Sequence, residues 1–442
     1  MIKQVSGNKI KFILGAALVF LISHILQINF IIPTLLLSLC LYLKLSYKTL
    51  NLKNYRLLNL TLLFVIIFVS GYSITKAGWL IFYLPFATIP MLSTMLFGKL
   101  GISLLLTIAS STTIASVCGN YFYLGVLFLI SGLLSTLLVK DSRRRSAVMR
   151  AGFIVGIMQM FSLFFIDRFR IYEPIRYAVL MFNGIVSSII VVGILPVFEY
   201  LFKTVTNISL LELADLSNPL LQRLILEAPG TYHHSLIVGN LSEAASNAVG
   251  AHALLTRTGA YYHDIGKLYK PEYFSENQQI KESRHDTLSP TMSKMVIMNH
   301  VKEGVELAKK YKLNPRLIDF IQQHHGSSLV YYFYRRALEN LVEDEVVKED
   351  GFRYPGPKPD SKETAIVLLA DSTEAAARSL KDPTPGKIEE LVHKIINNKF
   401  IEGQLDECDL TLKDLEKISA VFIRILSGIY HSRITYPQEF KK

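Results

Sequence analysis

Long apolar runs dominate the first half of the chain. Residues 10–202 carry few charges, whereas residues 203–442 mix apolar and charged positions as an ordinary soluble domain does. A helix needs about 20 apolar residues to cross the hydrocarbon core of a bilayer. Several apolar segments approach that length; they are 12–28, 30–46, 57–74, 79–98, 101–118, 120–139, 147–166 and 178–202. The pattern predicts a helical membrane domain over 1–202 with about eight spans.

Basic residues in the loops predict the orientation of these spans. They cluster over 44–56 and again over 140–145, and both loops are cytoplasmic if eight spans start from an N-terminus inside. The basic segment 167–170 would then lie outside, which counts against the scheme. A re-entrant hairpin at 27–29 is the alternative for the first two segments. Eight spans return the chain to the cytoplasm at Phe202, whereas seven would leave the second domain outside.

The second half shows the spacing of amphipathic helices. Apolar residues recur at three- and four-residue intervals, and they predict helices over 235–249, 301–311, 315–323, 361–380, 387–398 and 415–429. No run alternates over enough positions for a convincing sheet, so the predicted fold class is all-α. Residues 203–217 form a connecting helix or a plain linker, and 218–442 form the soluble domain. The proline-rich stretch 352–359 and the segment 382–386 interrupt the helices.

Composition changes this picture little. The formal net charge is +11, but many of the cations flank membrane spans, and no basic stripe with interleaved aromatics marks a nucleic-acid site. We therefore expect no nucleic acid polymer as partner. The cysteines, Cys40, Cys118 and Cys408, lie far apart. They indicate neither a disulfide framework nor a thiolate metal site, and they suit a reducing cytoplasm.

Metal-binding residue types recur between positions 231 and 371. Adjacent His263 and Asp264 place a nitrogen ligand beside a carboxylate that can bridge two ions, and other histidines come from separate predicted helices. Two divalent ions that share an aspartate activate a water and stabilise the transition state of phosphoryl transfer. The pattern indicates an enzyme that hydrolyses a phosphate ester.

Three segments carry a closer resemblance. They read LILEAPGTYHHS over 224–235, GAYYHDIGK over 259–267 and QLDECDLTL over 404–412. These resemble the bacterial seven-transmembrane-HD family within the HD phosphohydrolase superfamily, whose signature is H…HD…H…H…D. Its members (PgpH-like proteins) are cyclic-di-AMP phosphodiesterases. The resemblance implies a multi-pass protein of the bacterial cell membrane whose cytoplasmic HD domain hydrolyses cyclic-di-AMP to pApA. The Gly-Tyr-Pro signature that marks the cyclic-di-GMP class is absent after the HD motif, which favours cyclic-di-AMP as the substrate.

The resemblance also implies a ligand set. One ion would be held by His234, His263, Asp264 and Asp371, and the other by Asp264, His300 and His324. His263 and Asp264 would be the central catalytic pair. Nitrogen and oxygen ligands without thiolate favour manganese or iron as the two divalent ions, although zinc also binds such a set.

Other residues near the motifs have weaker expectations. His233 competes with His234, because neighbouring helical side chains point about 100° apart and cannot both face one ion. His325 would bind metal or a substrate phosphate, with the phosphate favoured. Lys267 and Arg378 could pair with the second phosphate or be plain surface cations. Four tyrosines could stack on adenine or belong to the core: Tyr261, Tyr262, Tyr332 and Tyr354.

One departure and three alternatives stay open. The family has a large extracytoplasmic domain after its first span, and here only a few residues around 27–29 could take its place. The alternatives are a phosphohydrolase of another nucleotide, a non-catalytic cyclic-dinucleotide receptor, and a transporter, which the absence of carboxylates deep within the spans disfavours. The lipid bilayer is an expected partner, and the sequence leaves open whether the chain forms a homodimer.

Overall fold

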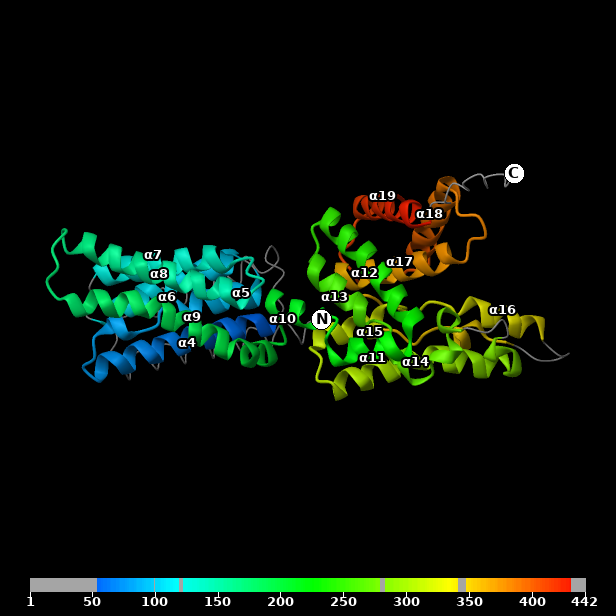
Figure 1. Cartoon of the computed structure of the whole chain (residues 1–442), viewed down its shortest axis with the longest axis horizontal. Helices are drawn as coiled ribbons and strands as arrows, with labels where there is room; N and C mark the ends of the chain where they lie inside the picture. The colour runs from blue at the N-terminus through cyan, green and yellow to red at the C-terminus, as the bar shows by residue number, and fades with distance from the viewer. Residues whose placement is uncertain (1–53, 99, 119–121, 279–282, 341–346, 431–442) are drawn as a thin grey trace, which may run out of the picture. The chain divides into compact units, whose positions relative to one another are not determined.

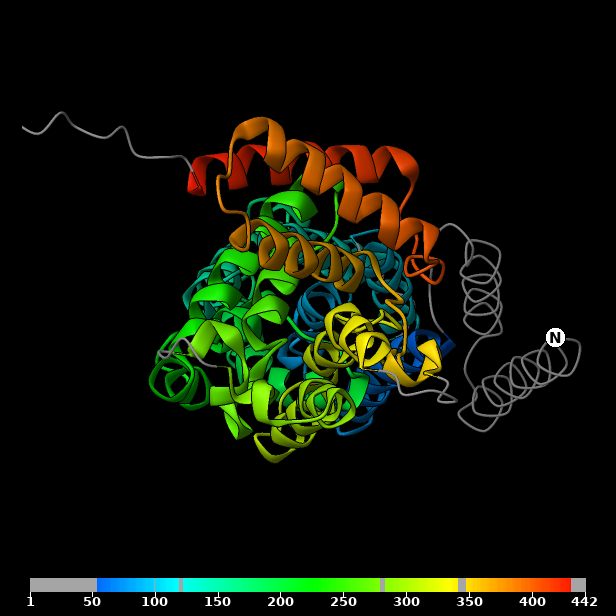
Figure 2. The same cartoon turned by 90° about the vertical axis from the view of Figure 1, so that its right-hand side faces the viewer.

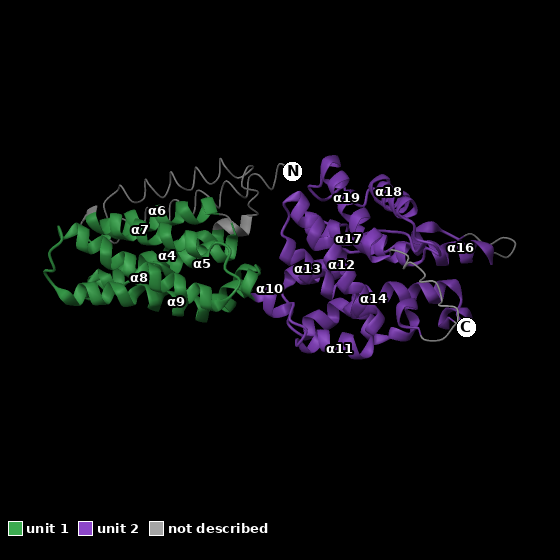
Figure 3. Cartoon of the chain, turned by 45° about the horizontal axis from the view of Figure 1, so that its top comes forward, with its two compact units in different colours: residues 1–208 green, residues 209–442 purple. Residues whose placement is uncertain are grey.

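The chain folds into two compact units, residues 1–208 and 209–442 (Figure 3). The computed structural model describes residues 54–430 except 99, 119–121, 279–282 and 341–346. The apolar segments at 12–28 and 30–46, with the turn between them, lie outside the described residues. The described residues form helices and no strand apart from a single bridge between Leu329 and Arg353, which confirms the predicted all-α fold class (Figure 1).

The first unit is a bundle of apolar helices. Its elements are α4 (Asn54–Lys76), η1 (Ile81–Tyr83), α5 (Thr88–Phe97), α6 (Leu100–Val117), α7 (Phe122–Val139), α8 (Arg145–Ile166) and α9 (Pro174–Phe202). Four of the described helical stretches are long and apolar enough to cross a membrane, namely Leu58–Lys76, Leu100–Val117, Arg145–Ile166 and Pro174–Phe202. Helices α8 and α9 approach closely at Gly152, Gly156 and Gly184, where the absence of side chains permits it. A side chain on Gly184 would overlap the backbone of Gly152 and Gly156.

The apolar segment predicted over 79–98 is not one continuous helix. The short helix η1 ends at Tyr83, Leu84 is extended, and α5 begins only at Thr88. Pro85 explains the break, because proline lacks an N–H and keeps the preceding residue out of helical geometry. The side chain of Asn183 on α9 donates to the carbonyls of Phe82 and Leu84 at 2.9 and 2.8 Å. This contact satisfies backbone groups that the interruption leaves without helical partners.

The second unit contains α11 (Pro219–Glu227), α12 (Pro229–Val249), α13 (Ala253–Tyr262), α14 (Pro290–Lys310), α15 (Pro315–Gln323), α16 (Tyr331–Glu339), α17 (Lys362–Arg378), α18 (Pro385–Ile401) and α19 (Leu412–Ile429). Short 3₁₀ turns η2 (Ile265–Tyr269), η3 (Pro271–Tyr273), η4 (Ser275–Asn277) and η5 (Arg284–Thr287) join α13 to α14, and η6 (Glu349–Phe352) precedes α17. Helices α17, α18 and α19 pack against one another (Figure 2).

Several helix starts in this unit follow one local rule. Proline occupies the first turn of α11, α14, α15 and α18, and the preceding polar residue caps the helix through its side chain. Proline suits this position because its missing N–H has no helical partner there anyway. Helix α14 begins at Pro290, well before the predicted residue 301. Met292 and Met295 in that first stretch are exposed, so the spacing of apolar residues does not mark the buried face there.

The expected connecting helix over 203–217 is shorter than predicted. Helix α10 comprises only Asn207–Leu213. Its end is held by α13, where the Tyr262 hydroxyl donates to the Leu213 carbonyl at 2.6 Å and the Thr258 hydroxyl lies 3.4 Å from the Leu210 carbonyl. Over 347–360 the chain has no α-helix, in agreement with the predicted loop.

Candidate metal centre

The six side chains expected to hold metal meet at one buried place. His234 lies on α12, His263 and Asp264 follow α13, His300 lies on α14, His324 follows α15, and Asp371 lies on α17. All six residues are buried, and the exposed fraction is largest for Asp371, at 7%. Helices widely separated along the chain therefore bring together the set that the sequence predicts.

Asp264 lies at the middle of this cluster, and its two oxygens face different partners. Oδ2 is 3.1 Å from His263 Nε2 and 3.6 Å from His234 Nε2. Oδ1 is 3.4 Å from His300 Nε2 and 3.6 Å from His324 Nε2. On the first side, Asp371 Oδ1 lies 3.1 Å from His234 Nε2. The carboxylate of Asp264 thus separates two groups of possible ligands.

Close backbone packing sets the position of His300 relative to Asp264. Gly266 lies two residues after Asp264, and a side chain there would overlap the carbonyl oxygen of His300 and the amide nitrogen of Gly304. Only glycine permits the η2 backbone to approach α14 so closely.

Hydrogen bonds fix the orientation of all four imidazoles. The Nδ1–H groups of His263, His300 and His324 donate to the carbonyls of Ala260, Ile297 and Ile321, at 2.6, 2.5 and 3.0 Å. These bonds leave each Nε2 with a lone pair directed into the cluster, the arrangement in which metal-binding histidines occur.

His234 is oriented by a carboxylate instead of a carbonyl. Its Nδ1–H donates to Glu374 Oε2 at 2.5 Å, and the other Glu374 oxygen accepts from the Tyr430 hydroxyl at 3.2 Å. Glu374 is 1% exposed. It lies three residues after Asp371 and so on the same face of α17. That spacing is the sequence signal that could have identified it.

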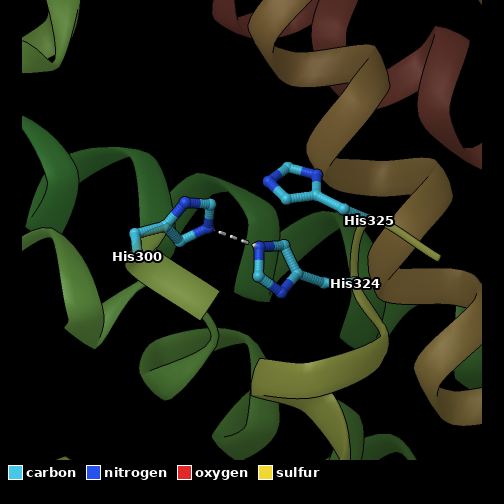
Figure 4. A group of neighbouring side chains, drawn as sticks. All are labelled: His300, His324 and His325. Atoms are coloured by element: carbon cyan, nitrogen blue, oxygen red, sulfur yellow. Dashed lines mark hydrogen bonds between the residues drawn. The ribbon is translucent and has the colours of Figure 1, made fainter. Parts of the chain in front are cut away.

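The residues present fit divalent cations. Among the described residues, the buried atoms His263 Nε2 and Asp264 Oδ1 have no hydrogen-bond partner. Ligand atoms of His234, His263 and Asp264 lie within 4.8 Å of one another, as do those of His300, His324 and His325 (Figure 4). Buried lone pairs that face one another without a donor are unfavourable. A cation bound between them would remove that penalty.

The charge balance of the cluster also favours a cation. Burial alone would lower the pKa of His234, but the carboxylates of Asp371 and Glu374 raise it to about 9. Burial lowers the pKa of His300 to about 4. The side with Asp264, Asp371 and Glu374 therefore attracts positive charge, and the side with His300 keeps a neutral imidazole available as a ligand.

His233 and His325 lie in different surroundings. His233 is exposed, so the structure places His234 and not its neighbour in the cluster. His325 lines the adjoining cavity, with Nδ1 3.5 Å from Asp371 Oδ2. Its ring stacks on Tyr354 at a centroid distance of 4.3 Å and an angle of 27°. Figure 4 shows His325 beside His324, with His300 and His324 directed toward each other.

Lys267 is held by acidic side chains. Its Nζ lies 2.8 Å from Asp264 Oδ2 and 2.7 Å from Glu276 Oε1. Burial alone would lower the pKa of Lys267, but these two carboxylates raise it above its usual value. The guanidinium of Arg378 lies 3.9 Å from the other oxygen of Glu276. Glu276 has no distinctive sequence signal, because it lies in the 3₁₀ turn η4 outside any motif.

A cavity of about 360 Å³ adjoins the cluster. His234, His300, His325 and Asp371 line it on the side of the cluster. Its lining also includes cationic and aromatic side chains, namely Lys267, Arg378, Lys399, Phe274 and Tyr354. Of the four tyrosines considered for adenine, Tyr354 lines this cavity, whereas Tyr262 is fully buried elsewhere in the core.

The fold and the site together define a membrane protein that carries an HD-type metal-binding domain. Two family models match accordingly. The model described as "7TM receptor with intracellular HD hydrolase" matches residues 7–206, and the HD domain model matches residues 231–376. The chain belongs to the family of seven-transmembrane receptors with an intracellular HD hydrolase domain, as the resemblance of its motifs predicted.

Named relatives agree with this assignment. The cyclic-di-AMP phosphodiesterase PgpH of Bacillus subtilis is 44% identical over 334 residues, which are 74% of this chain and 46% of that protein. The protein of the same name in Listeria monocytogenes is 37% identical over 398 residues, which are 87% of this chain and 54% of that protein. The chain thus spans about half the length of these curated relatives. The crystal structure of the L. monocytogenes PgpH HD domain in complex with cyclic-di-AMP is 46% identical, with a TM-score of 0.46, and covers 50% of this chain and 100% of that chain.

Proposed function

We propose that this protein is a phosphodiesterase that opens cyclic-di-AMP to linear pApA at a site with two divalent ions. The observation that carries the proposal is the cluster around Asp264, where buried Nε2 and carboxylate atoms from separate helices face one another. The phosphodiesterase activity named for relatives at 37–44% identity supports the choice of substrate.

The proposed ligand assignment follows the two faces of Asp264. His234, His263, Asp264 and Asp371 would hold one ion, and Asp264, His300 and His324 would hold the other. A nitrogen and oxygen ligand set favours manganese or iron. Ions bound there would supply a polarised water as nucleophile and would offset negative charge on the phosphate.

The protein side chains would orient and balance the reacting groups. A water oxygen bonds to phosphorus, the bond from phosphorus to the 3′ oxygen breaks, and a proton passes to that leaving oxygen. Glu374 and the backbone carbonyls hold the imidazoles in one tautomer, with Nε2 facing the cluster. Lys267 offsets the charge of Asp264. His325, at the edge of the cavity, would contact a substrate phosphate.

The proposed domain arrangement places this chemistry beside the membrane. Residues 1–202 would form the spans, 203–217 the connection and 218–442 the phosphodiesterase domain. With an even number of spans and the N-terminus inside, the HD domain faces the cytoplasm. A soluble signalling nucleotide would reach the site from that side.

Substrate turnover tests the proposal. The full chain, purified in detergent and loaded with manganese, is incubated separately with cyclic-di-AMP and cyclic-di-GMP, and products are separated by chromatography. We expect pApA from cyclic-di-AMP at a much higher rate than any product from cyclic-di-GMP. Turnover of cyclic-di-GMP without turnover of cyclic-di-AMP would refute the substrate assignment. Hydrolysis of nucleoside triphosphates alone would favour a different nucleotide phosphohydrolase.

A further inference from the structure

Three cationic side chains line the cavity, and two of them already face carboxylates. Lys267 is held between Asp264 and Glu276 at 2.8 and 2.7 Å. Arg378 lies 3.9 Å from Glu276. Lys267 therefore balances two carboxylates at the cluster, and Arg378 has a more distant acidic neighbour in Glu276.

Lys399 differs from both. It lies on α18, and its Nζ donates to the Ser328 hydroxyl at 2.7 Å. Within the part of the chain that the structure describes, no carboxylate oxygen lies within 4.0 Å of this ammonium. Burial lowers the pKa of Lys399, and the more distant carboxylates Glu402 and Asp371 counteract this only in part.

A cation in this position is costly for the fold alone. Lys399 is half-buried, so its ammonium loses part of its hydration, and proteins usually recover such a cost with an adjacent acid. Here the neighbouring hydroxyl of Ser328 offers one neutral hydrogen bond. A lysine ammonium has three N–H donors, so two remain after the bond to Ser328. Because Lys399 lines the cavity, these two donors are available to a ligand there. The charge is therefore directed at whatever the cavity binds.

We infer that Lys399 binds the second phosphate of a dinucleotide substrate, the phosphate that is not attacked. The inference rests on the proposed function. A cyclic dinucleotide carries two phosphodiester anions, and only one can lie at the Asp264 cluster. The other needs a positive partner within the same cavity. Lysine suits this role as a point charge that tolerates movement of the phosphate during ring opening.

The test separates binding of two phosphates from binding of one. The full chain with manganese is compared with Lys399→Met for binding of pApA, which has two phosphates, and of AMP, which has one. We expect the Kd for pApA to rise roughly tenfold to hundredfold, as for loss of a hydrogen bond to a charged group. The Kd for AMP should change by less than about twofold, and metal content should stay the same.

Kinetics and matched variants sharpen the result. For cyclic-di-AMP, the KM of Lys399→Met should rise while kcat changes by less than about threefold, and Lys399→Arg should restore most of the affinity. Lys394→Met, which removes an exposed lysine from the same helix, should match the wild type in every assay.

Two results would overturn the inference. One is unchanged pApA binding by Lys399→Met. The other is an equal loss of pApA and AMP binding, or a loss of metal, because Lys399 would then support the cluster. If the wild type fails to open cyclic-di-AMP, the proposed function fails, and the comparison of pApA with AMP still decides the role of Lys399.

Discussion

The two units differ in how their buried polar atoms are grouped: both contain unpartnered ones among the described residues, such as Ser103 Oγ and Ser187 Oγ in the first, but in the second some of them lie within a cluster of possible metal ligands. In the first unit, many buried hydroxyls bond to carbonyls one turn earlier in their own helix, as Thr107 does to Ser103 at 2.7 Å and Thr113 to Ala109 at 2.7 Å. In the second unit, His263 Nε2 and Asp264 Oδ1 are buried without a hydrogen-bond partner among the described residues. Local satisfaction of hydrogen bonds lets a helix pack in an apolar setting. Polar atoms that several helices leave facing one another indicate a ligand site.

Of the changes that test this comparison, metal removal should have the largest effect on hydrolysis and on the Tm of the second unit. Chelation followed by desalting should abolish hydrolysis, and added manganese should restore it. Loss of the ions should also lower the Tm of the second unit by roughly 5–10 °C, because ligands that bind the folded state stabilise it. Enzyme assays and calorimetry on the full chain check both effects. Full activity after verified metal loss would contradict the proposed mechanism.

Loss of the Asp264 carboxylate should have the second-largest effect on hydrolysis. Asp264→Ala removes the group that faces both sides of the cluster, and we expect kcat to fall by about 10³-fold or more. Asp286→Ala is the matched control, because Asp286 belongs to a second His-Asp dipeptide and pairs with Arg336 at an exposed position, 3.3 Å apart. It should retain wild-type activity. Intact hydrolysis by Asp264→Ala would be incompatible with a metal-activated water.

The carboxylate behind His234 should have an intermediate effect. Glu374→Gln keeps the shape of the side chain but removes the charge that accepts from His234 Nδ1. Substitution of such supporting partners typically costs about 10–100-fold in metal affinity or activity. Metal titration and kcat measurements check this, with the exposed Glu390→Gln as control. Identical metal affinity in Glu374→Gln and the wild type would show that the hydrogen bond does not tune the ligand.

A hydroxyl in the first unit should matter least. Thr107→Val removes a hydrogen bond that Thr107 makes within its own helix. Even a hydrogen bond between membrane helices contributes on average only about 0.6 kcal/mol, so loss of this bond within one helix should lower the Tm in detergent only slightly, and hydrolysis should change by less than about twofold. A tenfold loss of activity would break the comparison, because this unit would then contribute polar groups to catalysis.

The sequence predicted the six residues that meet around Asp264 but not the groups that surround them. His263 and Asp264 are adjacent, and the remaining ligands match a family signature, so their types and spacing are visible in the chain. Glu276 and Lys399 carry no such signal. Their roles depend on how η4 and α18 pack around the cavity, and hydrophobic periodicity does not encode that arrangement.

The boundaries of the helices likewise include some that the sequence predicts and some that depend on contacts between distant residues. Long apolar or amphipathic segments were predicted as helices because periodicity and length indicate them directly. The break at Pro85 could have been anticipated from proline chemistry, but its tolerance depends on Asn183, about a hundred residues later in the chain. The spacing of apolar residues does not predict the early start of α14, because Met292 and Met295 are exposed there.

The most direct test of the central claim is to locate the ions by anomalous X-ray scattering from crystals grown with manganese. The account predicts two peaks, one on each side of Asp264. One peak should lie among His234, His263 and Asp371, and the other beside His300 and His324. A single peak, or peaks away from Asp264, would contradict a carboxylate shared by two ions.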